Sequence, residues 1–304
     1  MALEYLERIG YYRLSGYWYP CRERASICWL TDDSRRPERY REEAIATDHF
    51  KAGSNFNKFV ELYAFDKVLR HLTLDALEQV EIALRVDISH GLGKVDTFAY
   101  ANPECLHPKF TTNTNRQGVV FHNAWIAKHE QLVVRSKEEF VQHNRDRYGL
   151  PLAIWVACEV WDFGALSMLF GGMKDADQDA IARKYGVQNG RVFASWLRSL
   201  NYLRNVCAHH SRLWNRNVVD QPRLPRSSQL AWTAAYEGDG GAQRHARARC
   251  YLLLRITRHI MGVVNPGSNW PQRMKAHLDA FPDLSAVGID MSAMGAMTGW
   301  EADW

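Results

Sequence analysis

Apolar residues recur at steps of three and four along most of the chain, which is the spacing of a helix that buries one face. The longest such stretch ends at Gly91 and Gly93 and contains Leu62, Phe65, Leu69, Leu72, Ala76, Val80 and Ala83. Similar spacing predicts helices near 119–134, 137–147, 152–170, 177–185, 190–208 and 244–263. Strand-like alternation is hard to find, and two short β-branched runs at 119–121 and 132–134 lie in helical surroundings. We therefore predict an all-α fold, a helical bundle with long loops.

The first of these helices carries Glu78, Glu81 and Arg85 on its polar face. Glu81 and Arg85 are four residues apart, the spacing at which opposite charges on a helix form an ion pair. We interpret this trio as structural, tying helices together.

Three segments have the composition of linkers. Residues 20–55 are charged and turn-rich, 101–118 contain Asn-Pro and His-Pro steps, and 217–243 contain two prolines and a glycine-rich tip. We accordingly divide the chain into an N-terminal segment with a charged loop at 1–56 and a helical domain at 57–304.

The end of the predicted helix at 190–208 collects groups that could act on a phosphodiester. Its core stripe consists of Leu197, Leu200, Leu203 and Val206. Arg204 lies beside this stripe, so we expect its guanidinium at the border between the buried core and the solvent-exposed surface. Residues 204–209 read Arg-Asn-Val-Cys-Ala-His, and imidazole exchanges a proton near pH 7 while guanidinium offers a fork of donors to phosphate oxygens. The spacing alone equally fits a solvated arginine and a capping or partly buried histidine.

Positive charge is concentrated around this motif. The whole chain has a net charge of +4, but the stretch from Arg198 to Arg258 holds eleven arginines against three acidic residues, a formal charge of +8, and no lysine. Arginine suits bidentate phosphate contacts and stacking on bases, which favours RNA as the partner. Arg198, Arg212 and Arg216 are the candidate RNA contacts; the alternative is a solvated helix face with ion pairs between helices.

Five blocks, spread in order over most of the chain, carry a family resemblance. They are 11–20 (YYRLSGYWYP), 65–70 (FDKVLR) continuing to 75–85 (DALEQVEIALR), 151–164 (PLAIWVACEVWDFG), 204–216 (RNVCAHHSRLWNR) and 270–274 (WPQRM). Together they resemble the Abi family of bacterial abortive-infection proteins, of the AbiD/AbiF type, which belongs to the wider group of HEPN-domain ribonucleases. Members usually carry a further helical segment before the first block, whereas Met1 lies ten residues upstream of it, so we expect a start further upstream or a missing N-terminal element.

The resemblance implies a HEPN-type helical domain with additional N-terminal helical elements and a metal-independent endoribonuclease that acts in anti-phage defence. RNA would be cleaved by transesterification through its 2′-hydroxyl, without a cofactor. His209 would be general base or acid, Arg204 would stabilise charge on the non-bridging oxygens, and Asn205 would orient one of them or cap the backbone. The resemblance also implies a homodimer in which two Arg/His pairs face a shared cleft, with His210 the competitor within one chain for the second proton role.

The six cysteines give no sign of a zinc site, because no two form a C-x-x-C pair. We expect reduced, mostly buried thiols, with Cys207 a packing residue. No apolar run approaches the roughly 18 residues of a membrane span, and the N-terminus has no secretion signal, so we expect a cytoplasmic protein.

Three functions remain open. The first is a HEPN ribonuclease in phage defence, and the second is a non-catalytic protein that binds a small structured RNA through its arginines. The third is a helical interaction protein in which Arg204 and His209 are structural. The RNA target, the trigger of activity and any restraining RNA or protein are left open by the sequence.

Overall fold

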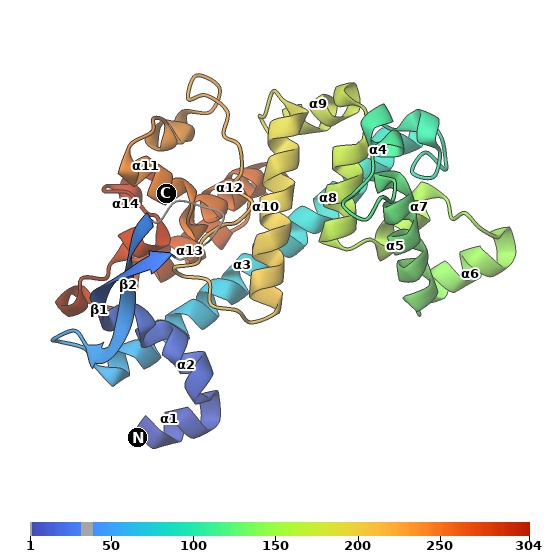
Figure 1. Cartoon of the computed structure of the whole chain (residues 1–304). Helices are drawn as coiled ribbons and strands as arrows, with labels where there is room; N and C mark the ends of the chain where they lie inside the picture. The colour runs from blue at the N-terminus through green and yellow to red at the C-terminus, as the bar shows by residue number, and fades with distance from the viewer. Residues whose placement is uncertain (1, 32–38) are drawn as a thin grey trace.

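The computed structural model describes residues 2–31 and 39–304, with side chains described for 2–27 and 44–304. The α-helices are α1 (Ala2–Ile9), α2 (Tyr11–Trp18), α3 (Phe56–Gly93), α4 (Pro108–Thr112), α5 (Phe121–Arg135), α6 (Glu139–Tyr148), α7 (Ile154–Ala157), α8 (Phe163–Gly172), α9 (Asp175–Lys184), α10 (Gly190–Ala208), α11 (Gly241–Arg247), α12 (Cys250–Val264), α13 (Trp270–Asp279) and α14 (Trp300–Asp303). Short 3-10 helices are η1 (Tyr19–Cys21), η2 (Pro103–Cys105), η3 (Cys158–Val160), η4 (Ala231–Tyr236), η5 (Ser285–Val287) and η6 (Met291–Met294). The prediction of a mainly helical fold is confirmed (Figure 1).

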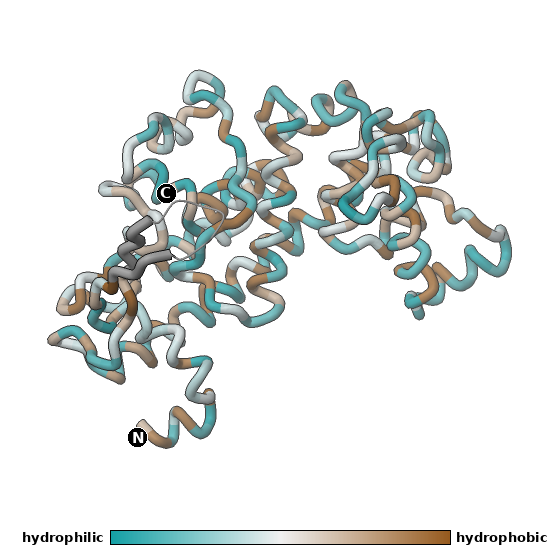
Figure 2. The backbone as a smooth tube through the Cα atoms, viewed as in Figure 1, coloured by the Kyte–Doolittle hydropathy of each residue, from teal (hydrophilic) through white to brown (hydrophobic). Residues whose placement is uncertain are grey.

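Helix α3 is the central element of the fold and packs against α2, α7, α8, α9, α10, α12 and α13. It spans 38 residues, and its N-cap Asn55 accepts a hydrogen bond from the Asn57 amide at 2.9 Å. In Figure 1, α2, α12 and α13 surround its N-terminal half, whereas α7 and α8 lie against its C-terminal half. Apolar and polar residues alternate along α3 and α10 in Figure 2, as expected for helices that bury one face.

Helix α10 packs against α3, α8, α9 and α12. Its bounds match the predicted 190–208, and all four residues of the predicted core stripe are buried. Its first turn is capped by Asn189, whose side chain accepts from the amides of Arg191 and Val192. Helix α10 is thereby capped at its first turn and packed against α3.

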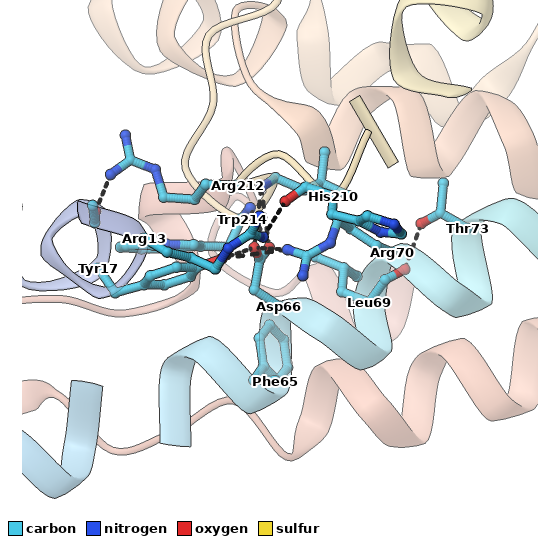
Figure 3. Close-up of polar contacts among 12 residues, drawn as sticks. Arg13, Tyr17, Phe65, Asp66, Leu69, Arg70, Thr73, His210, Arg212 and Trp214 are labelled. Carbon is cyan, nitrogen blue, oxygen red and sulfur yellow. Dashed lines mark hydrogen bonds and ion pairs between the residues drawn. The ribbon is translucent and has the colours of Figure 1, made fainter. Parts of the chain in front are cut away.

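A buried carboxylate joins α3 to two other segments (Figure 3). Asp66 is fully buried and accepts hydrogen bonds from the Tyr17 hydroxyl at 2.6 Å, from Arg70, and from the backbone amides of Leu213 at 3.2 Å and Trp214 at 2.8 Å. Burial raises the pKa of the Asp66 carboxyl, while the Arg70 charge and the other donors act in the opposite direction. One side chain therefore ties α2 and the chain beyond α10 to α3.

Two further contacts strengthen this junction. Arg13 in α2 donates to the backbone carbonyl of His210 at 3.1 Å. Arg212 donates to the carbonyl of Gly16, and a Cβ at position 16 would come within 3.3 Å of the Arg212 guanidinium. The absence of a side chain at Gly16 lets the two segments approach closely.

The expectation of a loop over residues 20–55 is wrong for most of that segment. Strands β1 (Arg22–Thr31) and β2 (Arg39–Phe50) form a two-stranded antiparallel sheet, with Ala25 opposite Ile45 and Ser26 opposite Ala44. These four residues are exposed, so the strands need no alternation of apolar and polar residues at these positions. Hydrophobic periodicity there does not distinguish the strands from a loop. The division of the chain at residue 56 stays a prediction.

Two predicted helices are interrupted in the structure. The helix expected at 152–170 is broken before Asp162, whose carboxylate caps α8 by accepting from the Ala165 amide at 2.7 Å. The helix expected at 244–263 is divided into α11 and α12. None of the helices in the described ranges is long and apolar enough to cross a membrane.

We expect Asp66→Asn to lower the free energy of unfolding by about 3–5 kcal/mol, because it leaves Arg70 buried without its counter-charge. Thermal or urea denaturation would measure this change. Asp146→Asn, at a side chain that is 72% exposed, is the matched control and should change stability by less than about 0.5 kcal/mol. Equal stability of the two variants would contradict a structural role for Asp66.

Candidate functional site

The motif lies where α10 ends. His209 is the C-cap of α10, and His210 follows with φ of +54°. The His210 amide donates to the Cys207 carbonyl at 3.1 Å and the Ser211 amide to the Val206 carbonyl at 3.0 Å, the two bonds of a Schellman motif. Glycine usually occupies the left-handed position of this motif, and another residue there costs roughly 1–2 kcal/mol.

The imidazole at position 210 is thus placed where glycine would be more stable. Strained residues of this kind concentrate at functional sites. The side chains of both His209 and His210 are exposed, at the C-terminal end of α10. The backbone below them is held by Arg13, so two accessible imidazoles stand on a fixed turn.

Arg204 lies on a different side of α10. It is half-buried, as predicted for the border of the core stripe, and its charge acts on the carboxyl groups of Glu81 in α3 and Asp162 before α8. Burial raises the pKa of Glu81, which the charges of Arg85 and Arg204 oppose. Burial also acts to raise the pKa of Asp162, but hydrogen bonds from Lys128 and the Ala165 amide outweigh it and lower that pKa.

The residues around Arg204 form an ionic cluster that joins three helices. The predicted ion pair between Glu81 and Arg85 is confirmed, with a separation of 2.9 Å. Arg85 also donates to the Trp161 carbonyl at 2.9 Å, while Lys128 in α5 binds Asp162 at 2.7 Å. Lys128 and Asp162 were missed at the sequence level, because they are far from the motif in sequence and belong to no local pattern.

Arg204 and His209 are five residues apart, which corresponds to roughly 140° around a helix. The Arg204 charge acts on the carboxyl groups of Glu81 and Asp162, whereas the His209 side chain is exposed at the end of α10. Among the residues whose side chains the structure describes, these two side chains share no hydrogen bond. Asn205 is half-buried, and its carbonyl accepts from the His209 amide at 3.0 Å.

Cys207 has the packing role expected for it. It is fully buried, and burial raises the pKa of its thiol to about 12, so the thiolate needed for nucleophilic attack is disfavoured. Four other buried free thiols are Cys21, Cys105, Cys158 and Cys250. Cys28 lies outside the residues whose side chains the structure describes.

The arginine-rich stretch is not one continuous basic surface. Six of its eleven arginines contact backbone carbonyls or aromatic side chains of the protein itself: Arg212, Arg216, Arg247, Arg249, Arg255 and Arg258. Arg212 is half-buried on Gly16, and Arg216 donates to the Tyr202 hydroxyl at 2.7 Å. Arg198 is exposed. RNA contacts by Arg198, Arg212 and Arg216 stay predictions.

A family model described as "Abi-like protein" matches residues 4–215. The matched range extends from α1 to the segment after α10, and so contains both the Asp66 junction and the Arg204–His209 motif. Comparison with curated proteins and with solved structures finds no match in either set. Because the family model covers well over half of the chain, this protein belongs to the Abi-like family.

Proposed function

We propose that the C-terminal end of α10 is the active site of a metal-independent endoribonuclease of the HEPN type that acts in phage defence. Membership of the Abi-like family points to abortive infection. The observation that carries the ribonuclease proposal is the presence of two exposed imidazoles, His209 and His210, on a fixed turn one and a half helical turns from Arg204.

The proposed step is a transesterification. The 2′-oxygen of a ribose attacks the adjacent phosphorus while the bond from phosphorus to the 5′-oxygen breaks. His209 accepts the proton of the 2′-hydroxyl, and a second imidazole in its protonated form gives a proton to the departing 5′-oxygen. Arg204 stabilises the charge that grows on the non-bridging oxygens. The products are a 2′,3′-cyclic phosphate and a 5′-hydroxyl.

Two features of the site indicate which residue donates the second proton and which copy of the chain provides Arg204. The strained backbone at His210 favours its imidazole for the second proton role, because the residue is kept there at a cost in stability. The wide angle between Arg204 and His209 favours a cleft shared by two copies of the chain, in which Arg204 of one copy serves the phosphate attacked beside His209 of the other. Asn205, next to Arg204, would orient the phosphate.

We expect purified protein to cleave labelled single-stranded RNA in EDTA, and His209→Ala to lose about 10²–10⁴-fold in rate, the usual contribution of a general acid or base. Arg204→Ala should be similarly impaired, whereas Arg183→Ala, at an exposed arginine in α9, should cleave normally. Binding of RNA without cleavage would instead support the alternative, a protein that binds a small structured RNA. Unchanged cleavage by His209→Ala would remove the motif from the mechanism.

Replacement of His210 by glycine should change the stability of the fold and the rate of RNA cleavage in opposite directions. His210→Gly should raise the free energy of unfolding by roughly 1–2 kcal/mol, because glycine adopts the left-handed conformation without strain. The same variant should lose at least about 10²-fold in cleavage rate if the imidazole donates the second proton. His210→Asn is the matched control, since asparagine tolerates this backbone conformation but cannot transfer the proton. Full activity in both variants would leave His209 of the second copy as the remaining proton donor.

A mixture of two inactive variants tests the shared cleft. In an equal mixture of Arg204→Ala and His209→Ala chains, half of the dimers combine the two variants, and each of these has one complete pair of opposing groups. Cleavage should therefore recover to about a quarter of the wild-type rate. No recovery, with dimers demonstrated by light scattering, would place both groups of each site in one chain.

A further inference from the structure

A second candidate site lies at the other end of α10. A pocket of about 370 Å³ is bounded by α4, the start of α5, the end of α8, α9, α10 and Arg223. Its volume falls within the range of small-molecule sites in proteins. In Figure 1, α4, α8, α9 and the N-terminal part of α10 are neighbours, and contacts join α4 to α8 and both α8 and α9 to α10. We call this hollow the α4–α10 pocket.

The α4–α10 pocket carries a surplus of positive charge. Its lining contains Lys109, Arg191, Arg198 and Arg223 but a single carboxylate, that of Asp175. Arg191 engages this carboxylate through two nitrogens, at 2.9 and 3.3 Å. Within the ranges whose side chains the structure describes, the other three cations form no ion pair. The charge of Lys109 also acts on Asp175, so a ligand in the pocket would meet two uncompensated arginines, Arg198 and Arg223, beside a lysine, which suits a phosphate.

Two aromatic rings line the same pocket. Phe110 is packed so closely on Gly172 that a Cβ at position 172 would come within 2.4 Å of its ring. The Phe110 ring also lies beside His122, with 5.6 Å between the two ring centroids. Phe121 is 38% exposed. An exposed ring beside arginines and a lysine is the arrangement on which nucleic-acid bases stack, because every base has a π-face.

The walls of the pocket are held in place by hydrogen bonds. The Arg223 amide donates to the Ser195 hydroxyl at 2.9 Å, and the Trp196 indole donates to the Arg223 carbonyl at 2.8 Å. Gln178 donates to the Met173 carbonyl at 2.7 Å, which joins α9 to the end of α8. The backbone that carries Arg223 and the junction of α9 with α8 are therefore in place before a ligand binds.

We infer that the α4–α10 pocket binds a nucleotide. The phosphate lies among Lys109, Arg198 and Arg223, and the base lies against the phenylalanine rings. Arg198 precedes His209 by eleven residues, which is about 16 Å along the helix axis, so this site is separate from the proposed cleavage site. The nucleotide is either free in solution or one unit of an RNA chain. This inference goes beyond the proposed function, because binding requires no cleavage.

The test uses the full chain carrying His209→Ala, so that cleavage plays no part and failure of the ribonuclease proposal leaves the result unaffected. Isothermal titration calorimetry is carried out with the four ribonucleoside 5′-monophosphates, the corresponding nucleosides, inorganic phosphate and a single-stranded RNA pentamer. At least one monophosphate or the pentamer should bind about tenfold or more tightly than inorganic phosphate, since stacking adds to the charge interaction. The nucleosides should bind more weakly than their monophosphates.

Variants locate the binding. Arg198→Ala with Arg223→Ala should weaken the affinity for the nucleotide by about tenfold or more, because two charge-assisted contacts are lost. Phe121→Ala should weaken nucleotide binding but leave phosphate binding unchanged, whereas Arg183→Ala should alter neither. Both replaced arginines are exposed, so the fold should persist, as thermal denaturation will verify. Binding of monophosphates identifies a free nucleotide, and binding of the pentamer alone identifies a unit of RNA. Phosphate binding as tight as nucleotide binding, or affinities that these variants leave unchanged, would overturn the inference.

Discussion

The position of the candidate site depends on the buried carboxylate of Asp66. It is surrounded by donors from three segments, namely the Tyr17 hydroxyl in α2, Arg70 in α3 and the amides of Leu213 and Trp214 beyond α10. A buried carboxylate is tolerated only when such donors are all in place, because each missing partner leaves desolvation uncompensated. The turn that presents His209 and His210 is therefore fixed by a contact centred outside the motif itself.

The arginines of the stretch 198–258 fall into two groups, those that contact other parts of the protein that the structure describes and those that do not. Six arginines act within the fold, on carbonyls and aromatic side chains, so they contribute to packing more than to an open basic surface. The charge of Arg204 acts on the carboxyl groups of Glu81 and Asp162, so this arginine also interacts with charges of the protein itself. The uncompensated cations Arg198 and Arg223 meet instead in the α4–α10 pocket.

Local periodicity predicted the parts of the structure that depend on local interactions. Helix α10, its buried stripe and the ion pair between Glu81 and Arg85 follow from residues three or four apart. The role of Asp66 could have been suspected, since an aspartate on a buried stripe with Arg70 four residues later needs a partner. The amides of Leu213 and Trp214 that bind it could not have been predicted, because backbone contacts across nearly 150 residues leave no pattern of side chains in the sequence. The same reasoning applies to the arginines that bind carbonyls. The two-stranded sheet was missed for another reason: the paired residues Ala25, Ser26, Ala44 and Ile45 are exposed and give no apolar alternation.

The chemistry proposed for the end of α10 requires the 2′-hydroxyl of the RNA, and this requirement can be tested without altering the protein. The cleavage position is first mapped in an all-ribose RNA, and a second RNA is then made with one 2′-deoxynucleotide immediately 5′ of that bond. The account predicts that the first RNA yields a 2′,3′-cyclic phosphate and a 5′-hydroxyl, and that the second stays intact at the same position. Cleavage of the deoxy-substituted bond, or products ending in a 5′-phosphate, would contradict it.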